Sequence, residues 1–229
     1  MKTIGIIGGM GPEATAAFYM AVVRIFQRRF NACHDADYPP MIIYSLPAPD
    51  VVEKMEDEER LVEMLRDAAG KLEKAGADFL VVACNTVQKY LVAIKGVVSI
   101  PCLDLNEELA RAAAERGYEK VCVFGSEATL RDGLLEKACR AVGVDVVVPP
   151  ASDRPALTRV IMTILSGCAY TRARKDLIEM ISKLRGSGVQ AVVLACTDLG
   201  LAVGEQDTGL PLVDSVEVLA EAAVRMSTT

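Results

Sequence analysis

The sequence predicts an α/β protein made of two similar lobes, each a parallel sheet flanked by helices. Short runs that are apolar on both faces alternate with longer amphipathic stretches along the 229 residues. Such alternation is typical of βαβ units joined by right-handed crossovers. Several sequence patterns also recur once, in the same order, about half a chain apart. Together these observations indicate an internal duplication, with one lobe built from each copy.

The elements follow from hydrophobic periodicity and from the residues that punctuate it. Strands are expected where short apolar runs are bounded by turn residues, near 3–8, 41–46, 78–84, 99–103, 120–125, 144–148, 190–196 and 210–214. Helices are expected where apolar residues recur at helical spacing, near 13–30, 53–75, 86–95, 106–117, 127–142, 153–167, 171–186 and 215–227. Prolines at 39–40 and 149–150 mark the approach to one strand and the exit from another.

The clearest repeat relates residues 76–86 to residues 188–197. In both, a glycine precedes a cysteine by eight positions, and an apolar run ends in Ala-Cys before the chain turns polar. Two further patterns recur at offsets of 110 to 114 positions. Glu-Ala-Thr occurs at 13–15 and again at 127–129. Pro-x-x-Asp-x-x-Glu-x-Leu-Ala occurs at 101–110 and again at 211–220. Ordinary likeness among α/β units is the alternative, but three matches in one order favour duplication.

The repeat divides the chain into two expected lobes. We expect the first lobe to contain residues 1–99 and 208–229 and to carry Cys84. We expect the second lobe to contain residues 100–207 and to carry Cys196. Ligands of open α/β sheets bind at the carboxyl ends of the strands, where both cysteines are expected. Two facing lobes would therefore bring the cysteines to opposite sides of one cleft.

Composition limits the class of protein. The net charge is −6 and no long basic run occurs, so binding to nucleic acid is not indicated. The apolar runs fall far short of the roughly 20 residues that span a bilayer, and no cleavage pattern follows the apolar N-terminus, so we expect no membrane segment or signal peptide. Seven cysteines without a Cys-x-x-Cys, and one histidine, predict a cytoplasmic protein with reduced thiols and no zinc site.

Cys84 and Cys196 are the candidate catalytic residues. Each follows a predicted buried strand and precedes polar residues suited to a helix start, Asn85 and Thr86 in one case and Thr197 in the other. A thiolate is a competent base and nucleophile, and a helix N-terminus favours the thiolate form. The alternative is a pair of small buried residues that fill the strand ends. Their duplication at equivalent positions favours a catalytic role.

A glycine-rich turn at residues 8–15 follows the first predicted strand. Its Gly-x-Gly-x-x-Ala pattern at 9–14 matches a dinucleotide-binding fingerprint in form. However, Pro12 interrupts the pattern, and no acidic residue ends the next strand as ribose binding requires. Backbone N–H groups around Met10 and Gly11 can instead bind a carboxylate at the helix start. A tight strand-to-helix turn without a ligand is the alternative.

These residues resemble the aspartate/glutamate racemase superfamily, and most closely its aspartate racemase-like branch. The Gly-Gly-Met-Gly-Pro-Glu-Ala-Thr at 8–15 looks like the opening motif of that branch. Cys-Asn-Thr at 84–86 looks like its first cysteine motif, and Cys-Thr-Asp at 196–198 looks like its second. The resemblance covers nearly the whole chain, from residue 1 to about 225. Glutamate racemases proper have an Asp-Ser opening and a histidine after the second Cys-Thr, both absent here.

The resemblance implies an isomerase that interconverts L- and D-amino acids. It implies two α/β lobes with the active site between them, commonly a homodimer, and no requirement for pyridoxal phosphate, metal or nucleotide. Under this hypothesis Cys84 and Cys196 exchange protons with Cα from opposite faces. The residues expected to bind the amino acid are Met10, Gly11, Asn85, Thr86, Thr129 and Thr197.

The sequence departs from the family pattern where a side-chain carboxylate would bind. Aspartate-specific members carry an arginine after the second strand, whereas residues 46–52 contain none, and a lysine near 165–167 is also missing. Arginines elsewhere are candidates for that role, and nothing selects among Arg60, Arg131, Arg154 and Arg172. Gln88 stands where the family often has a histidine. The substrate is therefore left open between acidic and neutral amino acids.

Two other functions fit parts of the pattern. Hydantoin racemases and maleate isomerases of the same superfamily also use cysteine pairs, although the glycine-rich opening and Cys-Thr-Asp favour the amino-acid branch. A non-catalytic binding protein of two lobes is the second alternative, but such a protein has no need of both cysteines. His34 is the only histidine and lies in a polar stretch far in sequence from both cysteines, so we assign it no catalytic role.

Overall fold

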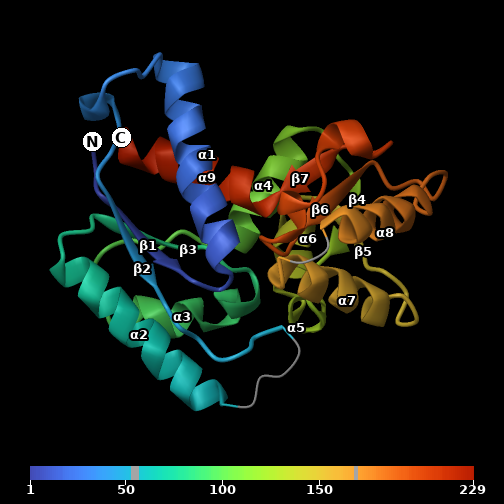
Figure 1. Ribbon diagram of the computed structural model, residues 1–229, viewed down its shortest axis with the longest axis horizontal. Helices are drawn as coiled ribbons and strands as arrows, with labels where there is room; N and C mark the ends of the chain where they lie inside the picture. Colours follow the sequence, from blue (N-terminus) through green and yellow to red (C-terminus); the bar gives the residue numbers. More distant parts are fainter. Residues whose placement is uncertain (53–56, 168–169) are drawn as a thin grey trace. The chain divides into compact units, whose positions relative to one another are not determined.

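The computed structural model describes residues 1–52, 57–167 and 170–229. The described chain contains two parallel sheets flanked by helices (Figure 1), so the predicted α/β fold is confirmed. The chain forms two compact units, Met1–Leu105 with Val216–Thr229, and Asn106–Ser215. None of the helices within these described ranges has the length and apolar character needed to cross a membrane.

The first unit is built on a sheet with the strand order β2-β1-β3. Its strands are β1 (Ile4–Gly8), β2 (Met41–Ser45) and β3 (Phe79–Val82). Every residue of β1 and β3 is buried, which is the state that runs apolar on both faces predict. β1 pairs in parallel with both neighbours, and Ile7 stands opposite Val82.

Helices cover both faces of this first sheet. In Figure 1, α1 (Pro12–Phe30) and α9 (Ser215–Ser227) lie on one face, while α2 (Glu58–Lys74) and α3 (Leu91–Lys95) lie on the other. The first unit also contains two short 3₁₀ helices, η1 (Asp35–Asp37) and η2 (Thr86–Tyr90). α1 begins at Pro12, where the missing N–H costs nothing, and α2 begins after Asp57, whose carboxylate accepts the backbone N–H of Arg60.

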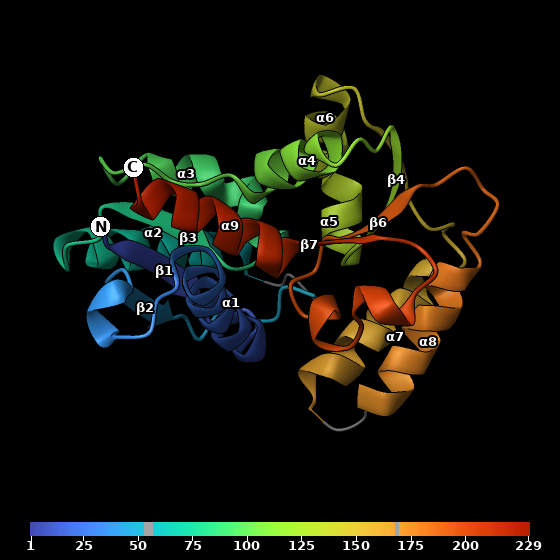
Figure 2. The same cartoon turned by 90° about the horizontal axis from the view of Figure 1, so that it is seen from above.

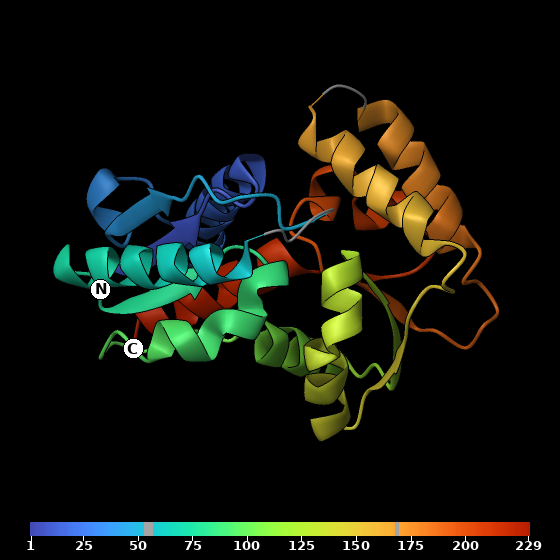
Figure 3. The same ribbon diagram turned by 90° about the horizontal axis from the view of Figure 1, so that it is seen from below.

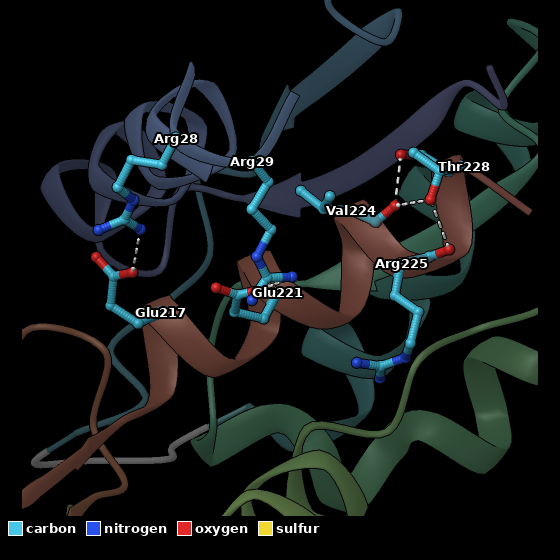
Figure 4. A network of polar contacts seen from close by, with 8 residues as sticks. Arg28, Arg29, Glu217, Glu221, Val224, Arg225 and Thr228 are labelled. Carbon is cyan, nitrogen blue, oxygen red and sulfur yellow. Dashed lines mark hydrogen bonds and ion pairs between the residues drawn. The ribbon is translucent and has the colours of Figure 1, made fainter. Parts of the chain in front are cut away.

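The last helix, α9, is attached to α1. Figure 4 shows Arg28 and Arg29 of α1 facing Glu217 and Glu221 of α9, with N···O separations of 3.9 and 2.7 Å respectively. Exposed ion pairs of this kind contribute only about 0–1 kcal/mol each. Apolar burial stabilises the helix in this unit more, and the fully buried apolar residues of α9 are Leu219, Ala220, Ala222, Ala223 and Val224.

The second unit is built on a sheet with the strand order β5-β4-β6-β7. Its strands are β4 (Lys120–Phe124), β5 (Asp145–Val147), β6 (Ala191–Leu194) and β7 (Leu212–Asp214), all parallel. β6 is buried along its whole length. This sheet has the order of the first one with an extra edge strand beside β6.

The helices of the second unit lie on both sides of its sheet. α7 (Arg154–Leu165) and α8 (Tyr170–Ser182) lie side by side on one side, as Figures 2 and 3 show from opposite directions. α4 (Leu105–Glu115) and α6 (Leu134–Ala141) lie on the other, together with α5 (Glu127–Asp132). The remaining 3₁₀ helices are η3 (Leu199–Leu201) and η4 (Glu205–Asp207).

The predicted duplication is visible in the topology. In the first sheet, Leu80 of β3 forms a parallel bridge with Cys102, at the place that β7 occupies beside β6. After this fourth position the chain leaves each sheet as a helix, α4 in one copy and α9 in the other. Nearly all of α4 belongs to the second unit and nearly all of α9 to the first. Each unit therefore contains the last helix of the other copy.

The chain passes between the units slightly later than the boundaries 99/100 and 207/208 that we expected. The passages fall at 105/106 and 215/216. Residues 100–105 remain with the first sheet because Leu80 accepts the N–H of Leu103 and donates to the carbonyl of Pro101. Residues 208–215 remain with the second sheet because β7 pairs with β6.

Several expected elements differ in detail. The helix expected over 86–95 is a 3₁₀ helix at Thr86–Tyr90 and an α-helix only at Leu91–Lys95. The strand expected near 99–103 is reduced to the single bridge at Cys102. The helix expected over 127–142 is interrupted by Gly133, which adopts a left-handed φ of 68° and separates α5 from α6. The helix expected over 53–75 is observed from Glu58, and residues 53–56 of that expectation lie outside the described residues.

Candidate active site

The carboxyl ends of β1 and β3 meet at one edge of the first sheet. Ile7 stands opposite Val82, and the N–H of Ala83 donates to the carbonyl of Ile7 over 3.0 Å. The turns that follow these strands therefore emerge together. They carry five of the residues expected in the site, namely Met10, Gly11, Cys84, Asn85 and Thr86.

Cys84 and Asn85 are almost fully buried at this edge, with 4% and 3% of their surface exposed. Both polar atoms of the Asn85 side chain, Oδ1 and Nδ2, lack a hydrogen-bond partner among the described residues. Leaving a buried donor or acceptor unsatisfied costs about 1–3 kcal/mol, and such groups require an explanation. A polar ligand that pairs with the amide of Asn85 would recover this cost, so the turn has the character of a binding site.

The side chain of Gln88 hydrogen-bonds to the backbone of the Cys84 turn. This side chain is 4% exposed, and its Nε2 donates to the carbonyls of Val82 and Cys84, each over 3.2 Å. Its Oε1 accepts the N–H of Leu105 over 3.3 Å, at the start of α4. The amide thus uses both donors and its acceptor on backbone groups.

The 3₁₀ helix η2, which follows Cys84, is also fixed to α2. The hydroxyl of Tyr90 donates to Glu58 Oε1 over 2.7 Å, and Lys89 Nζ lies 3.1 Å from the same oxygen. The hydrogen bond from Tyr90, followed by that from Lys89, lowers the pKa of the Glu58 carboxyl. The carboxylate form therefore persists at neutral pH and keeps both contacts.

The glycine-rich turn is closed by Thr15. The hydroxyl of Thr15 accepts the N–H of Gly9 over 2.9 Å and donates to the carbonyl of Gly11, also over 2.9 Å. Gly9 has a left-handed φ of 90°, and a Cβ at this position would overlap the backbone of Leu46. A glycine is required there, and it brings the ends of β1 and β2 into close contact. Met10 is buried beside this turn.

An equivalent edge lies at the carboxyl ends of β4 and β6 in the second sheet. The N–H of Ala195 donates to the carbonyl of Phe124 over 2.7 Å, as Ala83 does to Ile7 in the first sheet. The expected residues Thr129, Cys196 and Thr197 all belong to this edge and are 5%, 7% and 3% exposed. The structure thus groups the expected residues at two equivalent strand edges.

Cys196 lies beside a carboxylate that the sequence argument did not include in the site. Its thiol Sγ donates to Asp198 Oδ2 over 3.7 Å, and Asp198 is only 3% exposed. A thiol and a buried carboxylate in contact can share a proton, which is suited to acid–base chemistry. The signal was present in the sequence as Cys-Thr-Asp, but the strand pattern does not say which way Asp198 points.

Thr129 occupies the first turn of α5, where Ser126 caps the helix. The Ser126 hydroxyl lies 3.0 Å from the Thr129 hydroxyl and accepts the Thr129 N–H over 3.2 Å. Thr129 is thus the positional counterpart of Thr15, as the repeat predicts. Both threonines hydrogen-bond within a strand-to-helix turn, so their first role is to shape that turn.

The other described cysteines lie away from these edges. Cys33 is exposed, and Cys102 is half-buried at the bridge to Leu80. Burial raises the pKa of the Cys122 thiol to about 12 and that of the Cys139 thiol to about 11, so neither forms a thiolate at neutral pH. Cys168 lies outside the described residues.

The four candidate arginines are exposed or already engaged. Arg60, Arg131 and Arg172 are exposed. Arg154 is half-buried, but its Nε donates to the carbonyl of Pro149 over 3.1 Å, and its Nη1 lies 3.5 Å from Glu127 Oε1. Within the described ranges, no group of three or more His, Cys, Asp or Glu residues is arranged to hold a metal ion.

Comparison with known proteins identifies the class to which this fold and these turns belong. The chain is a member of the Asp/Glu/hydantoin racemase family, whose model matches residues 7–223. It is therefore an isomerase, an amino-acid racemase of this family. This agrees with the family that the sequence motifs resemble.

The relatives include several amino-acid racemases. The chain is 31% identical to the broad specificity amino-acid racemase RacX of Bacillus subtilis, over 96% of each chain. It is 25% identical to a glutamate racemase of Aquifex aeolicus, over 80% of this chain and 72% of that one. Among solved structures, it resembles an aspartate racemase homologue from Pyrococcus horikoshii OT3 (29% identity, TM-score 0.84, all of both chains). It also resembles the aspartate racemase of Picrophilus torridus (27% identity, TM-score 0.86, all of this chain and 95% of that one).

Proposed function

We propose that this protein racemises free amino acids by a two-base mechanism in which Cys84 and Cys196 act on the same Cα. The observation that supports this most directly is the duplicated cysteine turn, with the unsatisfied amide of Asn85 beside Cys84. Each cysteine is nearly buried at the carboxyl edge of its own sheet, where ligands of α/β proteins bind.

The mechanism needs one thiolate and one thiol. The thiolate removes the Cα proton, so a C–H bond breaks and an S–H bond forms. The thiol on the other side gives its proton to the opposite face of the carbanion, which inverts the centre and leaves the second sulfur as a thiolate. The protonation states of the two cysteines have then been exchanged, and the reverse reaction uses them in the opposite roles.

The carbanion requires stabilisation because the Cα proton of an amino acid is very weakly acidic. Preorganised donors near the α-carboxylate supply it. We assign this binding to Asn85 and Thr86 at the first edge and Thr197 at the second. Backbone groups of Met10 and Gly11 are further candidates, and Thr129 acts by keeping its turn in shape.

We further propose that neutral amino acids are accepted at least as well as aspartate. A second carboxylate buried without a cationic partner costs several kcal/mol. Of the four candidate arginines, Arg154 already contacts Glu127 and Pro149, and the other three are exposed. The 31% identical relative from Bacillus subtilis bears the name of a broad specificity racemase, which agrees with this choice. A homodimer and a cytoplasmic location, which the sequence argument expected, stay predictions.

Deuterium exchange at Cα tests both the chemistry and the substrate range. The protein is incubated in D₂O with aspartate, glutamate, alanine, methionine and homoserine, with EDTA present and no added pyridoxal phosphate. We expect exchange with inversion for several neutral amino acids, and kcat/KM values that do not single out aspartate. Arg154→Ala should lower kcat/KM for acidic and neutral substrates alike by less than about threefold, the size of a surface ion-pair effect.

Two outcomes would contradict this proposal. No exchange with any free amino acid, together with turnover of a hydantoin or of maleate, would assign the protein to another branch of the family. An aspartate preference of several orders of magnitude that Arg154→Ala abolishes would reverse the substrate assignment and identify Arg154 as the side-chain anchor.

A further inference from the structure

Gln88 occupies a gap in the hydrogen-bond ladder beside β3. Leu80 donates to the carbonyl of Pro101 over 2.8 Å and accepts the N–H of Leu103 over 2.9 Å. A parallel ladder would continue with a bond from the N–H of Val82 to the carbonyl of Leu103. The bond after it would join the N–H of Leu105 to the carbonyl of Val82. The Gln88 amide stands between these two groups instead, accepting from Leu105 and donating to Val82.

The second N–H of the same amide donates to the carbonyl of Cys84 over 3.2 Å. A rotation of the Cys84 peptide would also turn the Cα–Cβ bond that carries the sulfur. One buried amide therefore connects three segments, namely the last residue of β3, the peptide of the candidate base and the first residue of α4. Leu105 is the last residue of the first unit, so this amide lies where the chain leaves that unit.

The second copy has no such amide. Gly200 follows Cys196 at the spacing at which Gln88 follows Cys84. There the ladder continues for another step, because Leu194 pairs with Asp214 of β7. A Cβ at Gly200 would overlap Oδ2 of Asp214, so the aspartate side chain fills this place. Gln88 is thus a feature of the Cys84 copy alone.

We propose that Gln88 is a positioning residue for Cys84, fixing the peptide of Cys84 by replacing the missing ladder bond. This inference rests on the proposed role of Cys84 as a base. Gln88 is not assigned any contact with the substrate or the reacting atoms. Its effect should therefore appear in the chemical step and at Cys84, not in substrate binding or at Cys196.

The test compares Gln88→Met with Gln190→Met. Gln190 provides a matched control because its Oε1 also accepts backbone N–H groups, those of Glu119 and Lys120, at the opposite end of the strands. We expect Gln88→Met to lower kcat by about 10- to 100-fold, as small misplacements of a reacting group do, and to change KM by less than about threefold. Gln190→Met should leave kcat within about twofold, whatever it does to the melting temperature.

A second measurement is specific to Cys84. The rates at which iodoacetamide alkylates Cys84 and Cys196 are followed separately by peptide mass spectrometry in each variant. Gln88→Met should change the rate at Cys84 several-fold and leave that at Cys196 unchanged, whereas general loosening would raise both. If Gln88→Met does not fold, Gln88→Glu carries the test, because it keeps the length and polarity while removing both donors.

The results separate this inference from the proposed function. If Gln88→Met and Gln88→Glu both keep the kcat of the Gln190→Met control, or change alkylation equally at both cysteines, Gln88 is not a positioning residue. If Cys84→Ala itself keeps full racemisation, the two-base proposal fails first, and a slow Gln88 variant would then need another explanation.

Discussion

Cys84 and Cys196 end equivalent strands, yet the side chains packed against them differ in kind. Behind Cys84 stands a neutral amide, Gln88, that bonds only to backbone groups. Beside Cys196 stands a buried carboxylate, Asp198, that accepts a hydrogen bond from the thiol. The backbone plan was duplicated, whereas the immediate chemistry of the two sulfurs was not.

This difference bears on how a symmetric reaction can run in an asymmetric site. A racemase must remove a proton from either enantiomer, so under the two-base proposal each cysteine has to serve both as base and as acid. A carboxylate next to one sulfur favours the protonated thiol there, because a thiolate would face a second negative charge. Asp198 therefore opposes the thiolate form of Cys196, whereas the Gln88 amide behind Cys84 carries no charge.

The largest expected effect comes from removing either sulfur. Cys84→Ala and Cys196→Ala should each lower racemisation by about 10³-fold or more, because general acid–base catalysis contributes about 10²–10⁴-fold and two such steps are lost together. The measurement is loss of optical rotation from each pure enantiomer. A serine at either position should leave slow exchange of Cα with solvent without inversion, which NMR in D₂O detects.

Cys33→Ala is the matched control for these variants, since Cys33 is exposed and assigned no role. It should keep wild-type activity. Full racemisation by either of the two other alanine variants would contradict the two-base mechanism.

The next effect in size concerns the carboxylate beside Cys196. Asp198→Asn should lower kcat by about 10- to 100-fold, within the range of a group that assists acid–base catalysis. It should also speed alkylation of Cys196 at neutral pH, because the thiolate no longer faces an anion, and leave Cys84 unaffected. Mass spectrometry of the individual peptides gives both rates.

Other cysteines provide internal standards for that experiment. Burial raises the pKa values of Cys122 and Cys139 to about 12 and about 11, so both should stay unmodified in the folded protein. Cys33 is exposed and should react in every variant at one rate. Slower alkylation of Cys196 in Asp198→Asn would contradict the proposed effect of the Asp198 carboxylate on the neighbouring thiolate.

The fold was largely predictable because its strongest signals are local. Runs such as β1 and β3, apolar on both faces, lie where the pattern predicts, and so does the repeat of strand, turn and helix. The strand expected near 99–103 was wrong because apolar character does not reveal pairing, which here stops at the single Leu80–Cys102 bridge. The expected lobe boundaries already assigned α9 to the first lobe and α4 to the second, because the repeat is offset from the points where the chain passes between the units.

The part of the candidate site that repeats along the sequence was predictable. The cysteines and the residues after them could be recognised from repetition, and the orphaned amide of Asn85 supports their choice. Gln88 and Asp198 could not be assigned in this way. Gln88 was noted only as a departure from a family pattern, because its role depends on a ladder bond that fails to form. Asp198 depends on the direction of one side chain, which a sequence does not record.

The smallest expected effects are on the stability of the fold, and they come from the turns that follow β1 and β4. In the first copy Thr15 satisfies the N–H of Gly9, whereas in the second Ser126 caps the N–H of Thr129. Thr15→Val should lower the free energy of unfolding by about 1–3 kcal/mol, since it leaves a half-buried donor unsatisfied. Ser126→Ala removes a helix cap and should cost about 1 kcal/mol.

Denaturant unfolding measures both values, with Ser182→Ala as the control because that serine is exposed and should change stability by less than about 0.5 kcal/mol. Thr15→Val should cost more stability than Ser126→Ala because the backbone of the first turn is more constrained. Gly9 must keep its left-handed conformation against Leu46, so the first turn cannot relax to satisfy its N–H elsewhere. The N–H of Thr129 lies at a helix start, where water can replace a lost cap more readily. A larger loss for Ser126→Ala than for Thr15→Val would show that the second turn is the more constrained of the two copies.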